Sequence, residues 1–353
     1  MDINLSQQES ETNGSSRLVS SVLSEYGTMT RAALRQYLPE HEPRRYLYDL
    51  LADYPMRGGK MMRPSLCLAT AHLLGASVEE ALRTAVAIEL IHNALLVHDD
   101  IEDGSEQRRG RPTLHLLHGV PLALNAGDSL TLMALRPLLD NRNIIGERLA
   151  LRIIEETERM ARECAEGQAI ELGWRHYNVT DIGDAEYLEM VLKKTCWLAT
   201  IFPIRSGALI GSRGSIELEP FMRFGFFLGA AFQVQDDLLN LVGDERYGKE
   251  RDGDLWEGKR TLMLIHVFRQ ATPDERARLS MILSYTRARR SIGDVKWMRA
   301  LVEKYEGAEY ARRIAHELAG AALHEFALLS DNLPESRDKS FLQQMPTWVI
   351  ERT

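Results

Sequence analysis

The amino-acid sequence predicts an all-α fold, a single large bundle of long helices. Apolar residues recur every three or four positions along most of the chain, as at Val86, Leu90, Ala94 and Val97, which is the spacing of an amphipathic helix. No segment alternates apolar and polar residues over the length of a strand, and Asn-Gly occurs only near the N-terminus, so no β-hairpin is indicated. The composition, 44% hydrophobic and 27% charged, can supply a sizeable core.

The first twenty residues are expected to be a disordered polar tail (1–20), followed by one helical domain (21–353). The N-terminal segment MDINLSQQESETNGSS is rich in Ser, Gln and Glu, a bias that is typical of solvated chain. It has neither a basic start nor an apolar run, so it is not expected to be a signal peptide.

Charge and cysteine content exclude several classes of protein. With 43 basic and 51 acidic residues the formal charge is −8, which disfavours binding to nucleic acid through phosphate contacts. Cys67, Cys164 and Cys196 are far apart and form no CxxC pair, so a disulfide framework is not expected and the cytoplasm is favoured. The longest apolar stretch, Phe224–Val234, is too short to cross a bilayer, and no stable membrane insertion is expected.

The first acidic cluster ends a long apolar helix that is expected to run from near Thr84 to Gly104. Its sequence is Asp99-Asp100-Ile101-Glu102-Asp103, and Asp99 and Asp103 lie one turn apart on the same face. Like charges at this spacing destabilise a helix, and its C-terminal end prefers cations. The cluster therefore needs a compensating cation.

A second acidic cluster has the same design. The segment Phe232–Asn240 again ends an apolar helix, and Gln233, Asp236, Asp237 and Asn240 lie three and four residues apart. Two such helices facing each other would offer oxygen ligands to Mg²⁺, which binds one or two carboxylates together with substrate phosphates. Because the two turns must face each other across one cavity, the chain is expected to form one domain, although about 150 residues per domain would allow two.

Metal-bridged binding of a diphosphate also requires cations near both turns, and the sequence supplies them. Lys60 and Arg63 lie three residues apart on a helix that is expected to begin after Gly58-Gly59, an arrangement suited to anion binding. Arg108 and Arg109 follow the first acidic turn, and Lys249 and Lys259 lie on a loop downstream of the second. Lys194, in Lys193-Lys194-Thr195, interrupts another apolar helix.

Together these motifs resemble the trans-isoprenyl diphosphate synthases (polyprenyl synthetase family), most closely the bacterial geranylgeranyl diphosphate synthases, over roughly residues 45–325. The resemblance depends on the order and spacing of Gly59-Lys60-x-x-Arg63-Pro64, His92, Asp99-Asp100-x-x-Asp103, Arg108-Arg109-Gly110, Glu166-Gly167-Gln168, Lys194-Thr195, Phe232-Gln233-x-x-Asp236-Asp237-x-x-Asn240 and Gly258-Lys259. It implies the isoprenoid synthase fold, with helices around a deep central cavity, and a homodimer. It also implies head-to-tail condensation of isopentenyl diphosphate with dimethylallyl, geranyl or farnesyl diphosphate.

The resemblance assigns a role to each motif. Asp99, Asp103 and Asp236 would hold the allylic diphosphate through Mg²⁺, three ions in all, with Asp100, Asp237 and Asp254 in supporting roles. Arg108, Lys194, Lys249 and Lys259 would neutralise the leaving group. Isopentenyl diphosphate would be bound without metal by Lys60, Arg63, His92 and Arg109. The reaction zone would be lined by Gln168, Thr195 and Gln233. The family often has Asp where this chain has Asn240, which makes Asn240 a weaker candidate for a metal ligand.

Product length is expected to be set by the helix that carries the first acidic turn. In the family the residues four and five before the first Asp set the cavity floor, and here these are Leu95 and Ala94. Because neither is aromatic, the resemblance implies a C20 product, geranylgeranyl diphosphate. Ile91, one turn deeper, and Met133, on the next helix, are further candidates for the pocket wall.

Three alternatives remain open. The product could be longer than C20. A class I terpene cyclase would also use DDxxD, but its second metal motif does not occur in this chain. A non-catalytic subunit of a heteromeric synthase would be expected to lack carboxylates that are intact here.

Overall fold

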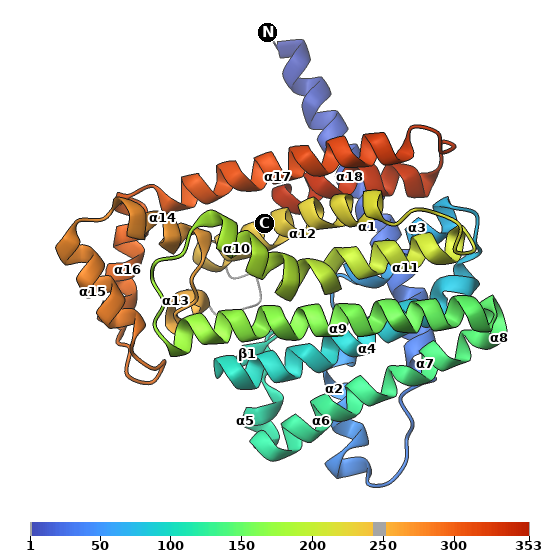
Figure 1. The fold of residues 1–353 in the computed structure, drawn as a ribbon, viewed down its shortest axis with the longest axis horizontal. Helices are drawn as coiled ribbons and strands as arrows, with labels where there is room; N and C mark the ends of the chain where they lie inside the picture. Colours follow the sequence, from blue (N-terminus) through green and yellow to red (C-terminus); the bar gives the residue numbers. More distant parts are fainter. Residues whose placement is uncertain (1, 243–251, 353) are drawn as a thin grey trace.

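The computed structural model describes residues 2–242 and 252–352, and it confirms the all-α prediction (Figure 1). Long helices with nearly parallel axes form the body of the molecule: α4 (Val78–Asp103), α9 (Glu147–His176), α12 (Glu219–Val242) and α17 (Gly307–Ser330). Their facing sides carry the apolar residues of one continuous buried core. Burial of these faces, more than helix propensity, stabilises such helices.

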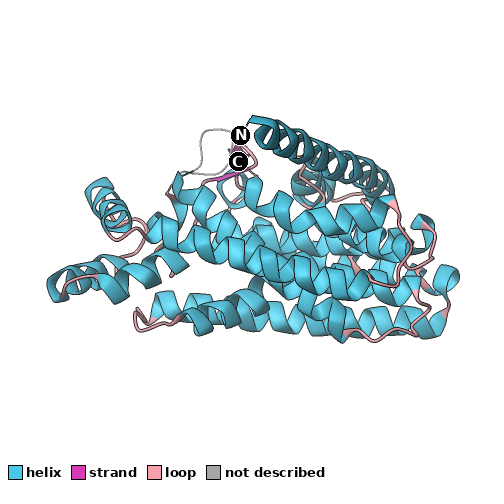
Figure 2. Cartoon of the chain, turned by 90° about the horizontal axis from the view of Figure 1, so that it is seen from above, coloured by secondary structure: helices cyan, strands magenta, loops and turns pink. Residues whose placement is uncertain are grey.

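The remaining helices surround this body. They are α1 (Asp2–Arg35), η1 (Arg44–Tyr46), α2 (Tyr48–Met56), α3 (Met62–Leu73), α5 (Leu114–His118), α6 (Val120–Met133), α7 (Leu135–Asp140), α8 (Arg142–Ile145), α10 (Asp184–Val191), η2 (Leu192–Ile201), α11 (Phe202–Gly211), α13 (Gly253–Glu257), α14 (Leu262–Gln270), α15 (Pro273–Leu283), α16 (Ile292–Lys304) and α18 (Arg337–Glu351). In the view from above, helix accounts for nearly all of the ribbon (Figure 2). Among the described residues, no helix is both long enough and apolar enough to cross a membrane.

The N-terminal segment differs from the expected disordered tail. Helix α1 begins at Asp2 and continues without a break to Arg35. Its later turns pack on the bundle through Val19, Val22 and Tyr26, which are fully or almost fully buried. Composition alone suggested a solvated tail, but the segment has no proline, and helix can extend outward from packed turns. The assignment of residues 21–353 to one domain stays a prediction.

Helix α4 ends where the sequence predicts and begins earlier. A capping box of Ser77 and Glu80 starts it, and Gly104 ends it in the left-handed conformation with φ 63°. No basic residue lies in its last turn. The compensating cations for this acidic turn must therefore come from other elements.

A short β-hairpin follows α4, although the sequence indicates none. Strands β1 (Gln107–Arg108) and β2 (Arg111–Pro112) pair antiparallel. The two residues between them, Arg109 and Gly110, have φ of 53° and 71°, and both values are positive, as a type I′ turn requires. The prediction was wrong because it looked for Asn-Gly or Asp-Gly, whereas Arg109 adopts the left-handed conformation here.

Helix α9 approaches η2 very closely at Gly167. A Cβ atom at this position would lie 2.1 Å from the backbone nitrogen of Lys194, so only glycine fits. Here the chain forms a π-helix over Leu192–Ile201, a wide helical form that is frequent at functional sites. The close approach places Lys194 beside the acidic turn of α4.

Candidate active site

A pocket of about 820 Å³ opens in the bundle and is lined by residues from both acidic turns. Asp99 on α4 and Asp236 on α12 line it together, with Lys194 and Gln233 beside them. The same four residues line a smaller adjoining recess of about 120 Å³, which Asp254 and Lys259 also line. The two acidic turns therefore face each other across one cavity, as the sequence predicts.

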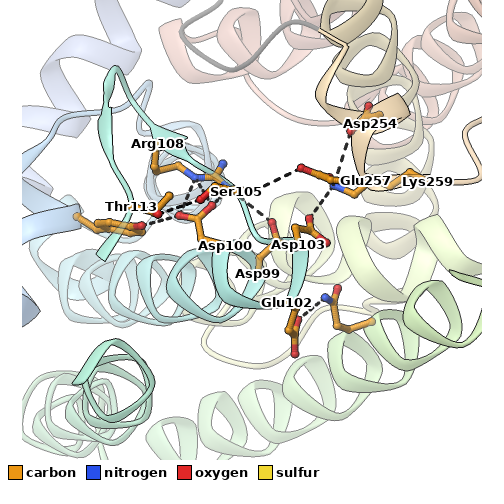
Figure 3. A network of polar contacts seen from close by, with 12 residues as sticks. Asp99, Asp100, Glu102, Asp103, Ser105, Arg108, Thr113, Asp254, Glu257 and Lys259 are labelled. Carbon is orange, nitrogen blue, oxygen red and sulfur yellow. Dashed lines mark hydrogen bonds and ion pairs between the residues drawn. The ribbon is translucent and has the colours of Figure 1, made fainter. Parts of the chain in front are cut away.

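Four cations from other parts of the chain compensate the acidic turn of α4, and Figure 3 shows two of them, Arg108 and Lys259. The Asp99 carboxylate lies 3.5 Å from the Lys194 ammonium and 3.6 Å from the Arg108 guanidinium. The buried Asp103 carboxylate lies 2.9 Å from the Lys259 ammonium and also accepts a hydrogen bond from Arg175. Burial alone would raise the pKa of Asp103, but the charges of Lys259, Lys194 and Arg175 hold it well below its ordinary value. Asp103 is thus held ionised, and Asp99 lines the pocket.

Unlike Asp99, Asp100 does not line the pocket. It is fully buried, and both of its oxygens accept hydrogen bonds from Arg108. The hydroxyl of Tyr54 donates a further bond of 2.5 Å to Asp100 Oδ2. With its oxygens engaged in this way, Asp100 orients Arg108.

The two aspartates of the second acidic turn also differ in their surroundings. Asp236 lines the pocket, and its Oδ1 lies 3.7 Å from the Arg352 guanidinium. The buried Asp237 accepts hydrogen bonds of 2.8 Å from the Tyr187 hydroxyl and 2.6 Å from the Gln233 amide. Burial raises the pKa of Asp237 to about 6. In turn Gln233 Oε1 accepts a 2.8 Å bond from Thr195, so Asp237 and Thr195 fix the Gln233 amide at the pocket wall.

Asn240 has a structural contact. Its Oδ1 accepts a 3.0 Å hydrogen bond from the backbone N–H of Asp254, at the start of α13. This bond fastens the segment that carries Asp254 and Lys259, whose side chains lie 3.6 Å apart. Lys249 falls outside the described residues.

The two central lysines are paired with buried glutamates. The Lys194 ammonium lies 2.7 Å from Glu171, and the Lys259 ammonium lies 2.7 Å from Glu257. Burial would lower the pKa of each lysine, but the surrounding carboxylates raise it well above the ordinary value. Both lysines are therefore protonated cations that line the smaller recess.

A second group of basic residues, called here the basic wall, also lines the pocket. Lys60, Arg63, His92 and Arg109 all line it, together with the buried carboxylate of Glu89. Burial lowers the pKa of Arg63 to about 10, with the charge of Glu89 opposing that shift. The structure places Lys60 before the helix rather than on it, because α3 begins at Met62 after Met61 adopts a left-handed conformation.

The apolar part of the pocket extends along α4, α6 and α9. Ile91 and Leu95 line it, and so does Thr131 of α6. Their role in product length stays a prediction. Ala94 is fully buried and does not line the pocket, and neither does Met133. Gln168 lines the wall near the acidic turn, where its amide donates a 2.5 Å bond to Glu102.

Several site residues have no role in the sequence-based assignment. Glu171 and Arg175 lie one turn apart on the face of α9 that follows Gln168, a spacing that could have indicated them. Trp348 and Arg352, from the C-terminal end of the chain, also line the pocket, and Lys60 lies 5.5 Å from the Trp348 ring. No sequence signal could place that end, because tertiary packing alone brings α18 beside α3 and α12.

The carboxylates fit a hard cation that binds through oxygen. Within residues 2–242 and 252–352 no three acidic, His or Cys side chains already converge as a metal cage. Asp99 and Asp236 line the pocket between the two turns, and the buried Asp103 lies one helical turn from Asp99, beside Lys259. Such an open set of carboxylates suits Mg²⁺, which shares its coordination sphere with waters and phosphate oxygens.

Comparison with known proteins gives one family. The model of the polyprenyl synthetase family matches residues 44–302. The geranylgeranyl pyrophosphate synthase of Geoglobus acetivorans is 31% identical over 95% of this chain and 99% of its own length. The geranylfarnesyl diphosphate synthase of Natronomonas pharaonis is 30% identical over 95% of this chain and 98% of its own. The solved structure of geranylgeranyl pyrophosphate synthetase from Pyrococcus horikoshii superposes with a TM-score of 0.83 at 31% identity, covering 96% of this chain and 99% of that one. These relatives are archaeal, whereas the sequence motifs suggested a bacterial likeness within the same family.

Proposed function

The chain belongs to the polyprenyl synthetase family and is a trans-prenyltransferase, and we propose that it condenses isopentenyl diphosphate with an allylic diphosphate in the presence of Mg²⁺. The product proposed is geranylgeranyl diphosphate. The observation that carries the proposal is the pair of acidic turns on α4 and α12, which line one pocket through Asp99 and Asp236. A second, basic wall in that pocket can hold another diphosphate.

The allylic substrate is placed between the two acidic turns. Asp99, Asp103 and Asp236 are the residues proposed to hold Mg²⁺, and the bound metal supplies positive charge that stabilises the departing diphosphate. Three ions are proposed, as in the family. Arg108, Lys194 and Lys259 add fixed charge around the same space, and their carboxylate partners keep them oriented before substrate arrives.

Isopentenyl diphosphate is placed at the basic wall. Lys60, Arg63 and Arg109, with His92, bind its diphosphate without metal, because no leaving-group charge develops there. This wall only needs to hold the double bond against the allylic carbon.

The reaction then follows from the two positions. The allylic C–O bond breaks, the isopentenyl double bond attacks the resulting cation, and a new C–C bond forms. Loss of one proton from the coupled product to the departed diphosphate completes the step without a dedicated protein base. The Gln233 amide, fixed by Thr195 and Asp237, and the nearby Gln168 place polar oxygens near the cation.

Product length is proposed to be set by the apolar end of the pocket. Neither Ile91 nor Leu95 is aromatic, so no ring at these positions closes the pocket near the acidic turn. A C20 product is favoured, and a longer product is the second candidate because a geranylfarnesyl synthase is among the relatives. A terpene cyclase or a non-catalytic subunit is a more distant alternative.

A homodimer is proposed for this chain. Helices α5, α6 and α7 carry exposed large apolar side chains that a second copy would cover: Leu117, Val120, Leu124, Leu132, Leu135 and Leu139. The cytoplasm is proposed as its location because all three cysteines are free and buried.

Incubation with labelled isopentenyl diphosphate tests the proposal. The purified protein receives Mg²⁺ and dimethylallyl, geranyl or farnesyl diphosphate, and the products are sized by chromatography. Incorporation of label into a C20 product supports the proposal. Mainly C25 or longer product would correct the length alone. Failure to consume isopentenyl diphosphate would favour a non-catalytic subunit, and turnover of the allylic substrate alone would favour a cyclase.

A further inference from the structure

Arg57, directly after α2, binds the backbone of the β-hairpin that carries Arg108 and Arg109. Its Nη1 donates to the carbonyl oxygen of Arg108 at 3.0 Å and to that of Arg111 at 3.4 Å. Its Nη2 donates to the carbonyl oxygen of Pro112 at 2.9 Å. One guanidinium thus holds both strands of the hairpin.

The guanidinium itself is held rigidly. The Arg57 side chain is 0% exposed, and its Nε donates to Asp53 Oδ1 at 2.5 Å. It also lies over the Tyr54 ring, 4.6 Å from the ring centre. A buried cation is tolerated only when it is paired and hydrogen-bonded, and here a carboxylate, three carbonyls and an aromatic face meet that need.

The hairpin needs such an anchor because it is very short. Each strand has two residues, and a two-stranded hairpin is marginally stable by itself. Its side chains nevertheless must point in two fixed directions. Arg108 reaches Asp100 and Asp99, whereas Arg109 donates to the backbone oxygen of Tyr54 at 2.8 Å and lines the basic wall.

We propose that Arg57 is a positioning residue for prenyl transfer, which sets the hairpin so that Arg108 and Arg109 each face their own diphosphate. The inference rests on the proposed function. Arg57 is not among the residues that line the pocket, and it would act through the backbone of residues 108–112. Lysine cannot replace it fully, because an ammonium lacks the planar fork that reaches a carboxylate and several carbonyls at once.

Arg57→Met and Arg57→Lys test this role, with Arg44→Met as the matched control. Arg44 also pairs with an aspartate of α2, Asp49, at 2.9 Å. That pair is exposed, and its hydrogen bonds do not involve the hairpin. For each variant, KM for isopentenyl diphosphate, KM for the allylic diphosphate, kcat and Tm are measured. Arg57→Met is expected to raise KM for isopentenyl diphosphate by about tenfold or more, since small misplacements of binding groups have effects of this order. Arg57→Lys should raise it less, and Arg44→Met should leave it unchanged.

A purely structural role predicts a different pattern. It would lower Tm and the active fraction, and so the apparent kcat, while both KM values stay within about twofold of wild type; that result overturns the inference. If Arg57→Met does not fold, KM for isopentenyl diphosphate is measured instead for Arg57→Lys and Asp53→Asn.

If wild type consumes no isopentenyl diphosphate, the proposed function fails. The positioning role is then tested by comparing the affinities of wild type and Arg57→Lys for inorganic pyrophosphate. Equal affinities would reject it, and a weaker affinity in the variant would support it.

Discussion

The Lys259 ammonium lies 2.9 Å from the Asp103 carboxylate, although Lys259 follows α13 and Asp103 ends α4. This pair joins the end of the first acidic helix to the segment that follows the second one. It explains how a helix can end in clustered carboxylates with no basic residue in its last turn. Lys259, from a segment distant in sequence, supplies the compensating cation that the acidic turn requires. The same lysine is proposed to neutralise the leaving diphosphate.

Replacing Asp103 should abolish most activity. Asp103→Asn removes one proposed metal ligand and leaves Lys259 and Arg175 facing a neutral side chain. We expect kcat to fall on the order of a hundredfold or more, as when a preorganised electrostatic partner is lost. Glu106→Gln, on the exposed segment after α4, is the control and should keep wild-type kcat. Near-wild-type turnover by Asp103→Asn would remove Asp103 from the metal site.

The two aspartates of the second turn should differ in their effect on metal dependence. Asp236 faces the pocket, whereas both oxygens of Asp237 accept protein hydrogen bonds. Asp236→Asn should raise the half-saturating Mg²⁺ concentration by about tenfold or more, while Asp237→Asn should change it less. Activity measured over a Mg²⁺ titration checks this. A larger shift for Asp237→Asn than for Asp236→Asn would reverse the assignment.

Bulk at Leu95 should control product length. Leu95 and Ile91 line the apolar end of the pocket. Leu95→Phe should shorten the main product by at least one isoprene unit, and Leu95→Ala should allow a longer one. Ala94→Phe is expected to act in the same direction as Leu95→Phe if the family's floor position applies here. Unchanged product size in both Phe variants would place the floor elsewhere, with Thr131 the next residue to test.

The start of α15 should give a pH-dependent contribution to stability. Hydrogen bonds from Lys304, Tyr305 and the backbone of Thr272 lower the pKa of Glu275 from 4.5 to about 2. A lowered carboxyl pKa stabilises the folded state fully above 4.5, and this contribution is lost as the pH falls towards 2. Urea denaturation should therefore show wild type more stable than Glu275→Gln at pH 7, with the difference shrinking by pH 3. An equal difference at both pH values would contradict the charge-based origin.

The sequence predicts the acidic turns well because helical periodicity and spacing fix which side chains share a face. Spacing alone does not separate Asp99 from Asp100, or Asp236 from Asp237, and only the family resemblance gave them different roles. Burial against Tyr54 and Tyr187 is what sets Asp100 and Asp237 apart in the structure. Nor could the sequence place Arg352, which only tertiary packing brings to the pocket. The hairpin at 107–112 was missed because its positive-φ turn uses Arg109 rather than Asn or Asp.

The acidic turns of α4 and α12 are proposed to share the metal ions that bind the allylic diphosphate. The most direct measurement is a crystal structure of the protein with Mn²⁺ and an unreactive thio analogue of an allylic diphosphate, with the ions located by anomalous scattering. We expect Mn²⁺ peaks in coordination contact with Asp99, Asp103 and Asp236 and with the diphosphate, so that the ions bridge these carboxylates to the diphosphate. Peaks that contact neither turn, or diphosphate bound without metal between them, would contradict this proposal.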